Sequence, residues 1–208
     1  MPNASTSFFG WVAFLLQKYG MLFLRGTGMT LLIALTGTAL GFALGLLVAI
    51  IRTIALPEKK KADSNAGVIV KRGLLRFVHM LMNVYIQVFR GTPMIVQAVV
   101  IYYGAQYAGV FMDTTFAAVF IISINTGAYM AEIIRGGIVS VDKGQFEAAH
   151  AIGMTHWQTM TTVVLPQAIR NILPSVGNEL IVNIKDSSVL NVISVSELFF
   201  QAKSAAGT

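Results

Sequence analysis

The sequence of 208 residues contains no cysteine, and only 12% of its residues are charged. The lack of cysteine excludes disulfide bonds and thiolate metal sites. Because soluble domains usually carry about a quarter charged residues, the shortage of charge indicates an integral membrane protein. The 55% share of hydrophobic residues and the mean hydropathy of +0.71 agree with that class.

A phosphate-binding loop is also absent. The pattern G-x-x-x-x-G-K-[ST] does not occur in the sequence, so the sequence offers no phosphate-binding loop of this type for a nucleotide. The net charge of +6 raises the question of nucleic-acid binding. Many basic residues, however, cluster beside apolar stretches, where the positive-inside rule places them. The sequence therefore disfavours a nucleic-acid partner.

Long uncharged stretches predict an all-α integral membrane protein, folded as a helical bundle. A helix needs about 20 apolar residues to cross the hydrocarbon core. Three stretches come close to or exceed this length, and charged residues interrupt a fourth; they are residues 26–51, 91–112, 114–131 and 172–200. The apolar run 8–16 is too short to cross, so residues 1–19 are expected to form an extracytoplasmic N-terminal segment.

The first span contains Gly37, Gly41 and Gly45 at four-residue spacing. This spacing favours the close approach of a neighbouring helix over the general tolerance of glycine in membrane helices. The sequence does not identify which helix packs against these glycines.

The second span allows two interpretations. Residues 91–112 form either a separate helix, with Pro93 near its start, or the end of a longer helix. The longer helix would begin at about residue 74 and be kinked at Gly91 and Pro93. Residues 74–90 would then lie in the membrane interface or pack against the bundle.

The distribution of basic residues predicts the orientation of the chain. If the first span runs inward, residues 52–90 and 136–170 are cytoplasmic loops of a single transmembrane domain over residues 20–205. Eleven basic residues then lie on the cytoplasmic side, namely Arg52, Lys59, Lys60, Lys61, Lys71, Arg72, Arg76, Arg90, Arg135, Lys143 and Arg170. Only Lys18 and Arg25 lie on the other side. This asymmetry strongly favours the inward direction.

The second of these loops predicts two short helices. Residues 145–152 have a helix-forming composition, and Gly153 is suited to end that helix. Thr155 and Gln158 have the spacing of a capping box that begins a second helix, which Pro166 closes. Such a helix–glycine–helix loop suits insertion into a groove of a partner protein. An ordinary hairpin between two spans is the alternative that spacing leaves open.

Seven residues of this loop follow a recognisable pattern, in which Val163 stands where isoleucine is usual. They are Glu147, Ala148, Ala149, Gly153, Val163, Leu165 and Pro166. The pattern is Glu-Ala-Ala, three residues, Gly, nine residues, Ile, one residue and Leu-Pro. It resembles the coupling loop of permease subunits in bacterial ATP-binding-cassette (ABC) importers.

Further segments resemble the polar amino acid subfamily, which includes the histidine, glutamine and arginine permeases. These segments are Phe89-Arg90-Gly91-Thr92-Pro93, Gly127-Ala128-Tyr129, Glu132-Ile133-Ile134-Arg135-Gly136-Gly137-Ile138, Lys143-Gly144-Gln145 and Lys185-Asp186-Ser187-Ser188. Together with the loop, the resemblance covers roughly residues 20–205.

The resemblance implies a non-catalytic, multi-pass subunit of the bacterial inner membrane with no cofactor of its own. It would pair with a second permease copy or a homologue, and partner ATPase subunits would bind ATP and magnesium. An extracytoplasmic binding protein would deliver a polar amino acid. The coupling residues carried over are those of the pattern, and Trp157 is a further candidate for an interface anchor. Because the family has five core spans, the last after Glu197–Phe199, the chain is expected to be truncated before the fifth.

Polar residues within the spans are candidates for the substrate path. They are Gln97 on the second span and Asn125, Thr126, Tyr129 and Glu132 on or at the end of the third. Spacings of four and three residues place Asn125, Tyr129 and Glu132 on one helix face. For Asn125 and Tyr129, hydrogen bonding between helices is the alternative.

Other polar residues have structural explanations. Glu132 is expected at the membrane edge, paired with Arg135 or Arg90, and this pairing is favoured over substrate binding. His150 and His156 make a weak metal site without cysteine, so no metal is predicted. Finally, a self-sufficient secondary amino acid transporter remains the alternative function, although no internal repeat of the kind found in many such proteins is evident.

Overall fold

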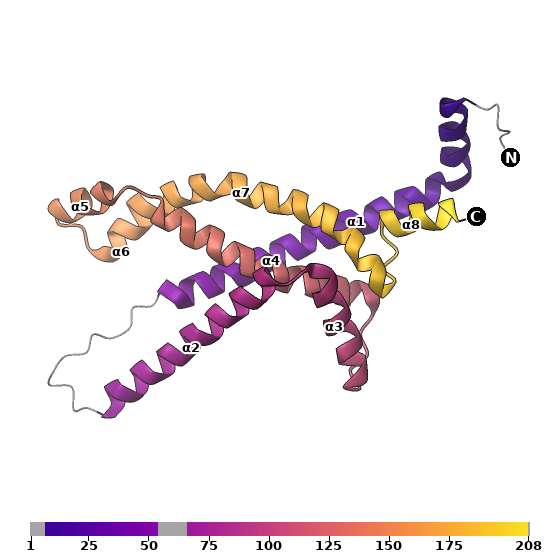
Figure 1. Ribbon diagram of the computed structural model, residues 1–208. Coiled ribbons are helices and arrows are strands. Elements are labelled where there is room, and N and C mark those ends of the chain that lie inside the picture. Colours follow the sequence, from indigo (N-terminus) through magenta and orange to yellow (C-terminus); the bar gives the residue numbers. More distant parts are fainter. Residues whose placement is uncertain (1–6, 54–65, 208) are drawn as a thin grey trace.

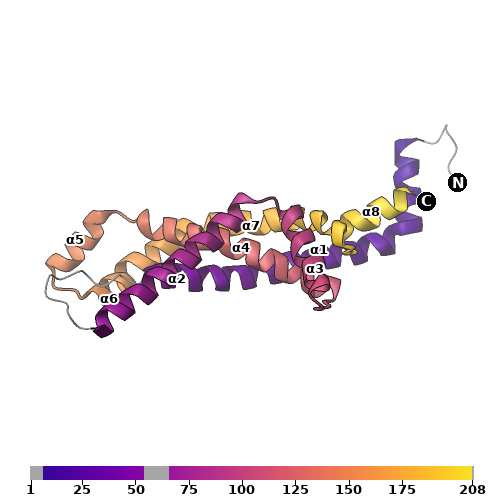
Figure 2. The same cartoon turned by 60° about the horizontal axis from the view of Figure 1, so that its bottom comes forward.

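The computed structural model of the chain describes residues 7–53 and 66–207. The connector with Lys59, Lys60 and Lys61 lies outside the described residues. Within the described ranges the chain forms helices and no strand, which confirms the predicted all-α class. The helices form an elongated bundle with α5 and α6 at one end and α8 at the other (Figures 1 and 2).

The elements follow one another with short connections. In chain order they are α1 (Phe8–Thr53), α2 (Ala66–Gly91), α3 (Met94–Tyr107), α4 (Thr114–Val139), α5 (Lys143–Ala151), α6 (His156–Gln158), the π-helical turn η1 (Thr159–Val164), α7 (Leu165–Asp186), the 3₁₀-helix η2 (Ser187–Ile193) and α8 (Leu198–Ala206). The helix α1 continues through residues 19 and 20, so the expected N-terminal segment is part of a longer helix.

The two central helices, α1 and α4, pack closely because α1 presents glycines to α4. A Cβ atom on Gly41 would lie 2.6 Å from the Cβ of Thr126. The same substitution on Gly37 would overlap Ile122, and on Gly45 it would overlap Met130. The predicted close packing at these glycines is confirmed, and the partner helix is α4.

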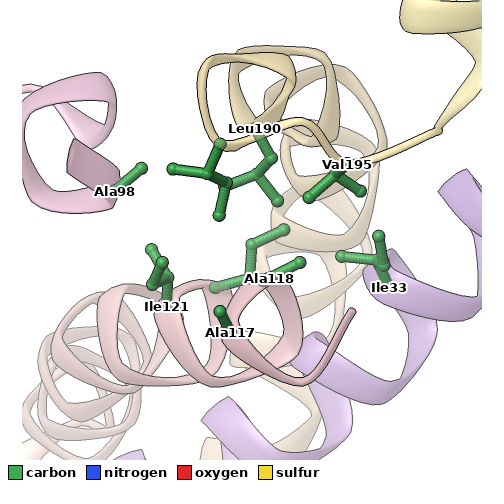
Figure 3. Close-up of a cluster of buried hydrophobic side chains, with 9 residues drawn as sticks. Ile33, Ala98, Ala117, Ala118, Ile121, Leu190 and Val195 are labelled. Atoms are coloured by element: carbon green, nitrogen blue, oxygen red, sulfur yellow. The ribbon is translucent and has the colours of Figure 1, made fainter. Parts of the chain in front are cut away.

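One apolar core lies beside this contact, near the middle of the bundle. It joins α1, α3, α4 and the η2 region (Figure 3). Its fully or almost fully buried members are Ile33, Ala98, Ala117, Ala118, Ile121, Ile122, Leu190, Ile193 and Val195. The small alanines allow α3 and α4 to approach, while the branched side chains fill the space between the helices.

The second predicted span does not form a helix over all of residues 91–112. The chain bends by 114° between α2 and α3, at the break next to Pro93. Proline lacks an N–H and tolerates the start of a helix, so the chain ends one helix and begins another there. With 14 residues, α3 is about 21 Å long and too short to cross a bilayer alone. The structure thus agrees with a separate helix that has Pro93 near its start, although this helix ends at Tyr107 rather than Met112.

Within the predicted cytoplasmic range 52–90, residues 66–90 belong to the helix α2. Its second half packs along the bundle, where Ile86 is buried with Val48 and Ala128. The hydroxyl of Tyr85 also donates a hydrogen bond of 2.6 Å to the carbonyl of Ile124. These contacts confirm the expectation that residues 74–90 pack against the bundle. The other predicted loop, 136–170, is shorter, since α4 extends to Val139 and α7 begins at Leu165.

Two described helices, α1 and α4, are long and apolar enough to cross a membrane, and the bent pair α2–α3 makes up to three. The expected fourth span, 172–200, instead divides into α7, η2 and α8. Helix α7 begins earlier than predicted and ends at Asp186. Its charged and polar residues keep it out of the set that is apolar enough to span.

Candidate functional site

Helices α5 and α6 and the turn between them, residues 143–158, form what we call the elbow. Asp142 caps α5, with its carboxylate accepting a hydrogen bond of 2.7 Å from the N–H of Gly144. The helix ends at Ile152, and Gly153 has φ +83°, a left-handed conformation that glycine adopts without strain. The predicted first helix and its glycine end are confirmed.

The second arm of the elbow is only partly as predicted. Thr155 and Gln158 form the expected capping box at the start of α6. The helix does not close at Pro166 but continues through η1 into α7. Proline cannot donate the backbone hydrogen bond of a regular turn, and the wider π-turn just before it accommodates that loss. One arm is therefore a short helix, and the other is the beginning of a long one.

The coupling candidates do not all face outward. Glu147 and Ala148 are exposed on α5, whereas Ala149 is 4% exposed and belongs to the interior of the elbow. Ile152 and Trp157 are 79% and 75% exposed at its tip. The tip thus presents two large apolar side chains on either side of Gly153, and the sequence analysis had not singled out Ile152.

An apolar pocket of about 440 Å³ lies between the elbow and the ends of α1 and α4. Trp157 and Leu165 line it from one side, and Ile50 and Ile138 from the other. Trp157 therefore borders this pocket while most of its side chain is exposed. Its exposure is compatible with the predicted role of an interface anchor.

Gln97 and Asn125 hold the α2–α3 bend against α4. The amide of Asn125 donates a hydrogen bond of 2.9 Å to the side-chain oxygen of Gln97. Gln97 in turn donates bonds of 3.0 Å to the carbonyls of Phe89 and Thr92. Both side chains are buried. Their hydrogen-bonding capacity is used within the protein, so the alternative of helix–helix bonding describes them better than substrate contact.

Thr126 belongs to a second buried polar group, which connects three helices. The amide of Asn183 on α7 donates hydrogen bonds of 2.8 Å to Thr38 on α1 and 3.0 Å to Thr126 on α4. The sequence analysis missed Thr38 and Asn183. A polar residue flanked by apolar ones on each helix was the only available signal.

Glu132 forms ion pairs with Arg135, at 2.9 Å, and with Arg52 at the end of α1. The predicted i, i+3 pair with Arg135 is confirmed. The other predicted partner, Arg90, lies instead over the ring of Tyr129, 5.4 Å from its centroid. Arg52 was missed because it is 80 residues away in the sequence. Glu132 thus joins two helices at one end of the bundle.

Two further carboxylates lie on α7. Glu179 is 8% exposed and lies near Arg90 and Asp186, although no ion pair joins these side chains among the described residues. Together with Tyr129 under Arg90, they form a charged group that we call the acid–arginine cluster: Arg90, Tyr129, Glu179 and Asp186. Asp186 is the last residue of α7, and the sequence analysis had not singled out Glu179. Across the described ranges, no group of three or more histidine and acidic side chains could hold a metal ion.

Comparison with known proteins gives a consistent result. Residues 65–207 match the model of the family described as "Binding-protein-dependent transport system inner membrane component". The chain is 40% identical over 184 residues to the glutamine transport system permease protein GlnP of Escherichia coli K12, covering 88% of this chain and 75% of that one. It is 39% identical over 166 residues to the L-cystine transport system permease protein TcyB of Bacillus subtilis, covering 80% and 64%.

Solved structures agree with the sequence comparison. The crystal structure of an amino acid ABC transporter with histidines superposes with a TM-score of 0.80 at 36% identity, covering 98% of this chain and 84% of that one. The inward-facing MetNI methionine ABC transporter has the same fold, with a TM-score of 0.65 at 21% identity over 88% and 80%. The bundle and its elbow thus define a membrane-embedded transport permease. The chain belongs to the family of binding-protein-dependent transport system inner membrane components.

Proposed function

We propose that this chain is the transmembrane permease subunit of an importer of polar amino acids in the bacterial inner membrane. Partner ATPase subunits bind ATP and magnesium, and this chain couples their hydrolysis to alternating access. The importer contains a second permease copy or a homologue, and an extracytoplasmic binding protein delivers the substrate. The named relatives that transport glutamine and L-cystine support this substrate class.

The observation that carries the proposal is the shape and position of the elbow. It projects from one end of the bundle, and α8 lies at the other end (Figure 1). Its tip exposes Ile152 and Trp157 around a left-handed Gly153. Exposed large apolar side chains on a compact projection are typical of a protein-binding surface. We assign this surface, with the exposed Glu147 and Ala148, to the ATPase.

The acid–arginine cluster is the best substrate contact in the bundle. An α-amino acid carries an ammonium and a carboxylate, and the cluster offers both complementary charges through Glu179, Asp186 and Arg90. Ionisable groups within a membrane bundle are costly, so they are retained where they act on a substrate or an ion. Of the residues predicted for the substrate path, Tyr129 is the one that belongs to this cluster.

Reconstitution tests the proposal against the alternative of a secondary transporter. Proteoliposomes contain the full-length permease, its ATPase and its binding protein, or the same set without the ATPase. We expect uptake of radiolabelled polar amino acids only with ATP and all components. Uptake by the permease without any ATPase would refute the proposal. Family membership already favours the ATP-driven reading.

A further inference from the structure

The two helices that carry the elbow are joined closely at its base. On α4, Gly137 faces α7, and a Cβ atom at this glycine would overlap the Cγ2 of Ile172. The same atom would lie 3.2 Å from the carbonyl oxygen of Ala168. The neighbouring Gly136 has nothing within 4 Å of such an atom. Of these two glycines, therefore, only Gly137 is required for the close approach of α4 and α7.

A hydrogen bond lies one turn nearer to the elbow. The amide of Asn171 on α7 donates a bond of 2.9 Å to the hydroxyl of Ser140, the residue that caps the end of α4. The Ser140 hydroxyl in turn donates a bond of 2.8 Å to the carbonyl of Gly137. The bond thus bridges the points where the chain leaves for the elbow and returns from it.

An apolar core continues this contact into the elbow. Val141, Val164 and Ala168 are buried against one another. Phe146 from α5 and Met160 from η1 pack on them. The elbow therefore rests on the same two helices through side chains as well as through the backbone. Packed interiors of this kind transmit a displacement rather than absorb it.

We infer that α4, the elbow and α7 form one rigid lever, in which Gly137, Ser140 and Asn171 are positioning residues that transmit motion from the ATPase to the bundle. The inference rests on the proposed function and adds which residues make the coupling rigid. Force at the elbow reaches the acid–arginine cluster because α4 carries Tyr129 and α7 carries Glu179. If the base of the elbow opened instead, ATPase closure would bend the elbow and leave the cluster unmoved.

A covalent bridge tests the lever directly. Since the chain has no cysteine, S140C/N171C introduces the only two thiols of the permease. In the reconstituted importer, a short bifunctional thiol reagent is applied, with the untreated variant and the treated wild-type permease as controls. Because both substitutions remove the hydrogen bond, the untreated variant is expected to transport less substrate per ATP hydrolysed than the wild type, and bridging is expected to restore this ratio toward the wild-type value. Arrest of uptake on bridging would overturn the inference, since the base would then have to open during transport.

Substitutions supply a second readout. G137A wedges α4 from α7, whereas G136A is the matched control with open space around its new methyl group. We expect G137A to retain basal ATPase activity but to lower the coupling ratio about fivefold or more, since the new methyl group must displace a packed side chain. G136A should match wild type. The double variant G137A/I172A, which removes the overlapping side chain, should restore coupling, and failure to restore it would count against transmission through this contact.

The hydrogen bond is tested by S140A, N171A and the double variant. Because both side chains are exposed, their loss should leave expression and assembly intact. If the bond acts as proposed, the double variant should be no worse coupled than either single one. Additive losses, or no loss at all, would contradict the role of the bond. Absence of ATP-dependent uptake by the wild-type permease would instead refute the proposed function, so the two failures are distinguishable.

Discussion

The side-chain amide of Asn183 on α7 lies 2.8 Å from the hydroxyl of Thr38 on α1, to which it donates a hydrogen bond. The same amide bonds to Thr126 on α4. All three side chains are buried, at 2%, 8% and 0% exposure. In a membrane, where apolar surfaces give helices little reason to choose one another, such bonds and close glycine contacts decide which helices pair.

Replacing Asn183 should loosen this connection between three helices. N183A leaves Thr38 and Thr126 without their shared partner, and we expect a loss of about 1–3 kcal/mol in the free energy of unfolding. Unfolding of the purified permease in mixed micelles measures this loss. N83A is the control, because Asn83 is exposed on α2 and the described structure shows no hydrogen bond for it. Equal stability of the two variants would contradict the role of Asn183.

The glycines of α1 predict a second contrast. In G41A the new methyl group lies 2.6 Å from the Cβ of Thr126, so α1 and α4 must separate. The expected cost is about 1–3 kcal/mol, the range for overpacking a filled core. G28A, on the same helix, has nothing within 4 Å and should be neutral. Thermal unfolding of both variants in detergent measures the difference. Because alanine raises helix propensity at both positions, a G41A variant as stable as G28A would contradict the role of close packing.

Breaking the ion pair between Arg52 and Glu132 should lower stability mainly because it leaves one charged side chain without its partner. The attraction between the two charges contributes less. Their side chains are 22% and 19% exposed, so each is only partly desolvated. We expect E132A to cost more than the roughly 0–1 kcal/mol of a surface pair and less than the roughly 3–5 kcal/mol of a fully buried one. The double variant R52L/E132L should regain part of the loss, as measured by chemical unfolding. A double variant as unstable as the sum of both single ones would argue against direct pairing.

Substitutions of Gly153 at the elbow tip should act through backbone conformation rather than through steric overlap with neighbouring atoms. At φ +83°, Gly153 tolerates no β-branched residue without strain, although a Cβ atom there would meet nothing within 4 Å. G153V is therefore expected to distort the tip and weaken ATPase association about tenfold, while binding of the extracytoplasmic protein is retained. G153N, which accepts the left-handed conformation more readily, should be close to wild type. Co-purification and surface plasmon resonance with the ATPase test this, and equal binding by G153V would contradict the assignment of the tip.

Acidification should act on the start of α4 through Asp113. The backbone N–H groups of Phe116 and Thr115 donate hydrogen bonds to this exposed carboxylate and hold its pKa below the ordinary value of 3.8. A depressed pKa means that the carboxylate stabilises the folded state above the unfolded pKa and that this contribution is lost as pH falls through the folded pKa. Below about pH 3.8, the wild-type protein should therefore lose stability. D113N should not lose this contribution, because its side chain still caps the helix but does not titrate. Helix content by circular dichroism during acid titration measures the effect, and identical titrations of both proteins would contradict it.

The coupling loop shows how far local sequence rules reach. Gly153 and the Thr155–Gln158 capping box act over one helical turn, so their roles followed from spacing. The error at Pro166 arose because the rule that proline ends a helix ignores the π-turn, which depends on packing beyond that turn. Similarly, nothing local indicated that Ala149 faces inward while Ala148 faces out.

The membrane assignment and the predicted close approach at Gly37, Gly41 and Gly45 rested on composition and period, which the sequence contains in full. The sequence did not identify α4 as their partner, because any helix with a complementary surface could pack against the three glycines. Long-range pairs were likewise beyond reach: Arg52 with Glu132, Asn183 with Thr38, and Arg90 with Tyr129 instead of Glu132. Each joins residues on different helices, and local periodicity gives no register between helices.

The sequence by itself thus determined a helical membrane protein, its family and the turn chemistry of the elbow, since these depend on composition and on residues within one or two turns. Only the tertiary structure decided which polar side chains are satisfied internally and which ionisable ones are buried within the bundle. Gln97, Asn125 and Thr126 bond to other parts of the chain, whereas Glu179 is buried on α7 without an ion pair among the described residues. The physical reason is that a buried polar group is stable only with a suitable partner. Here the partner comes from a separate helix and depends on how the helices pack.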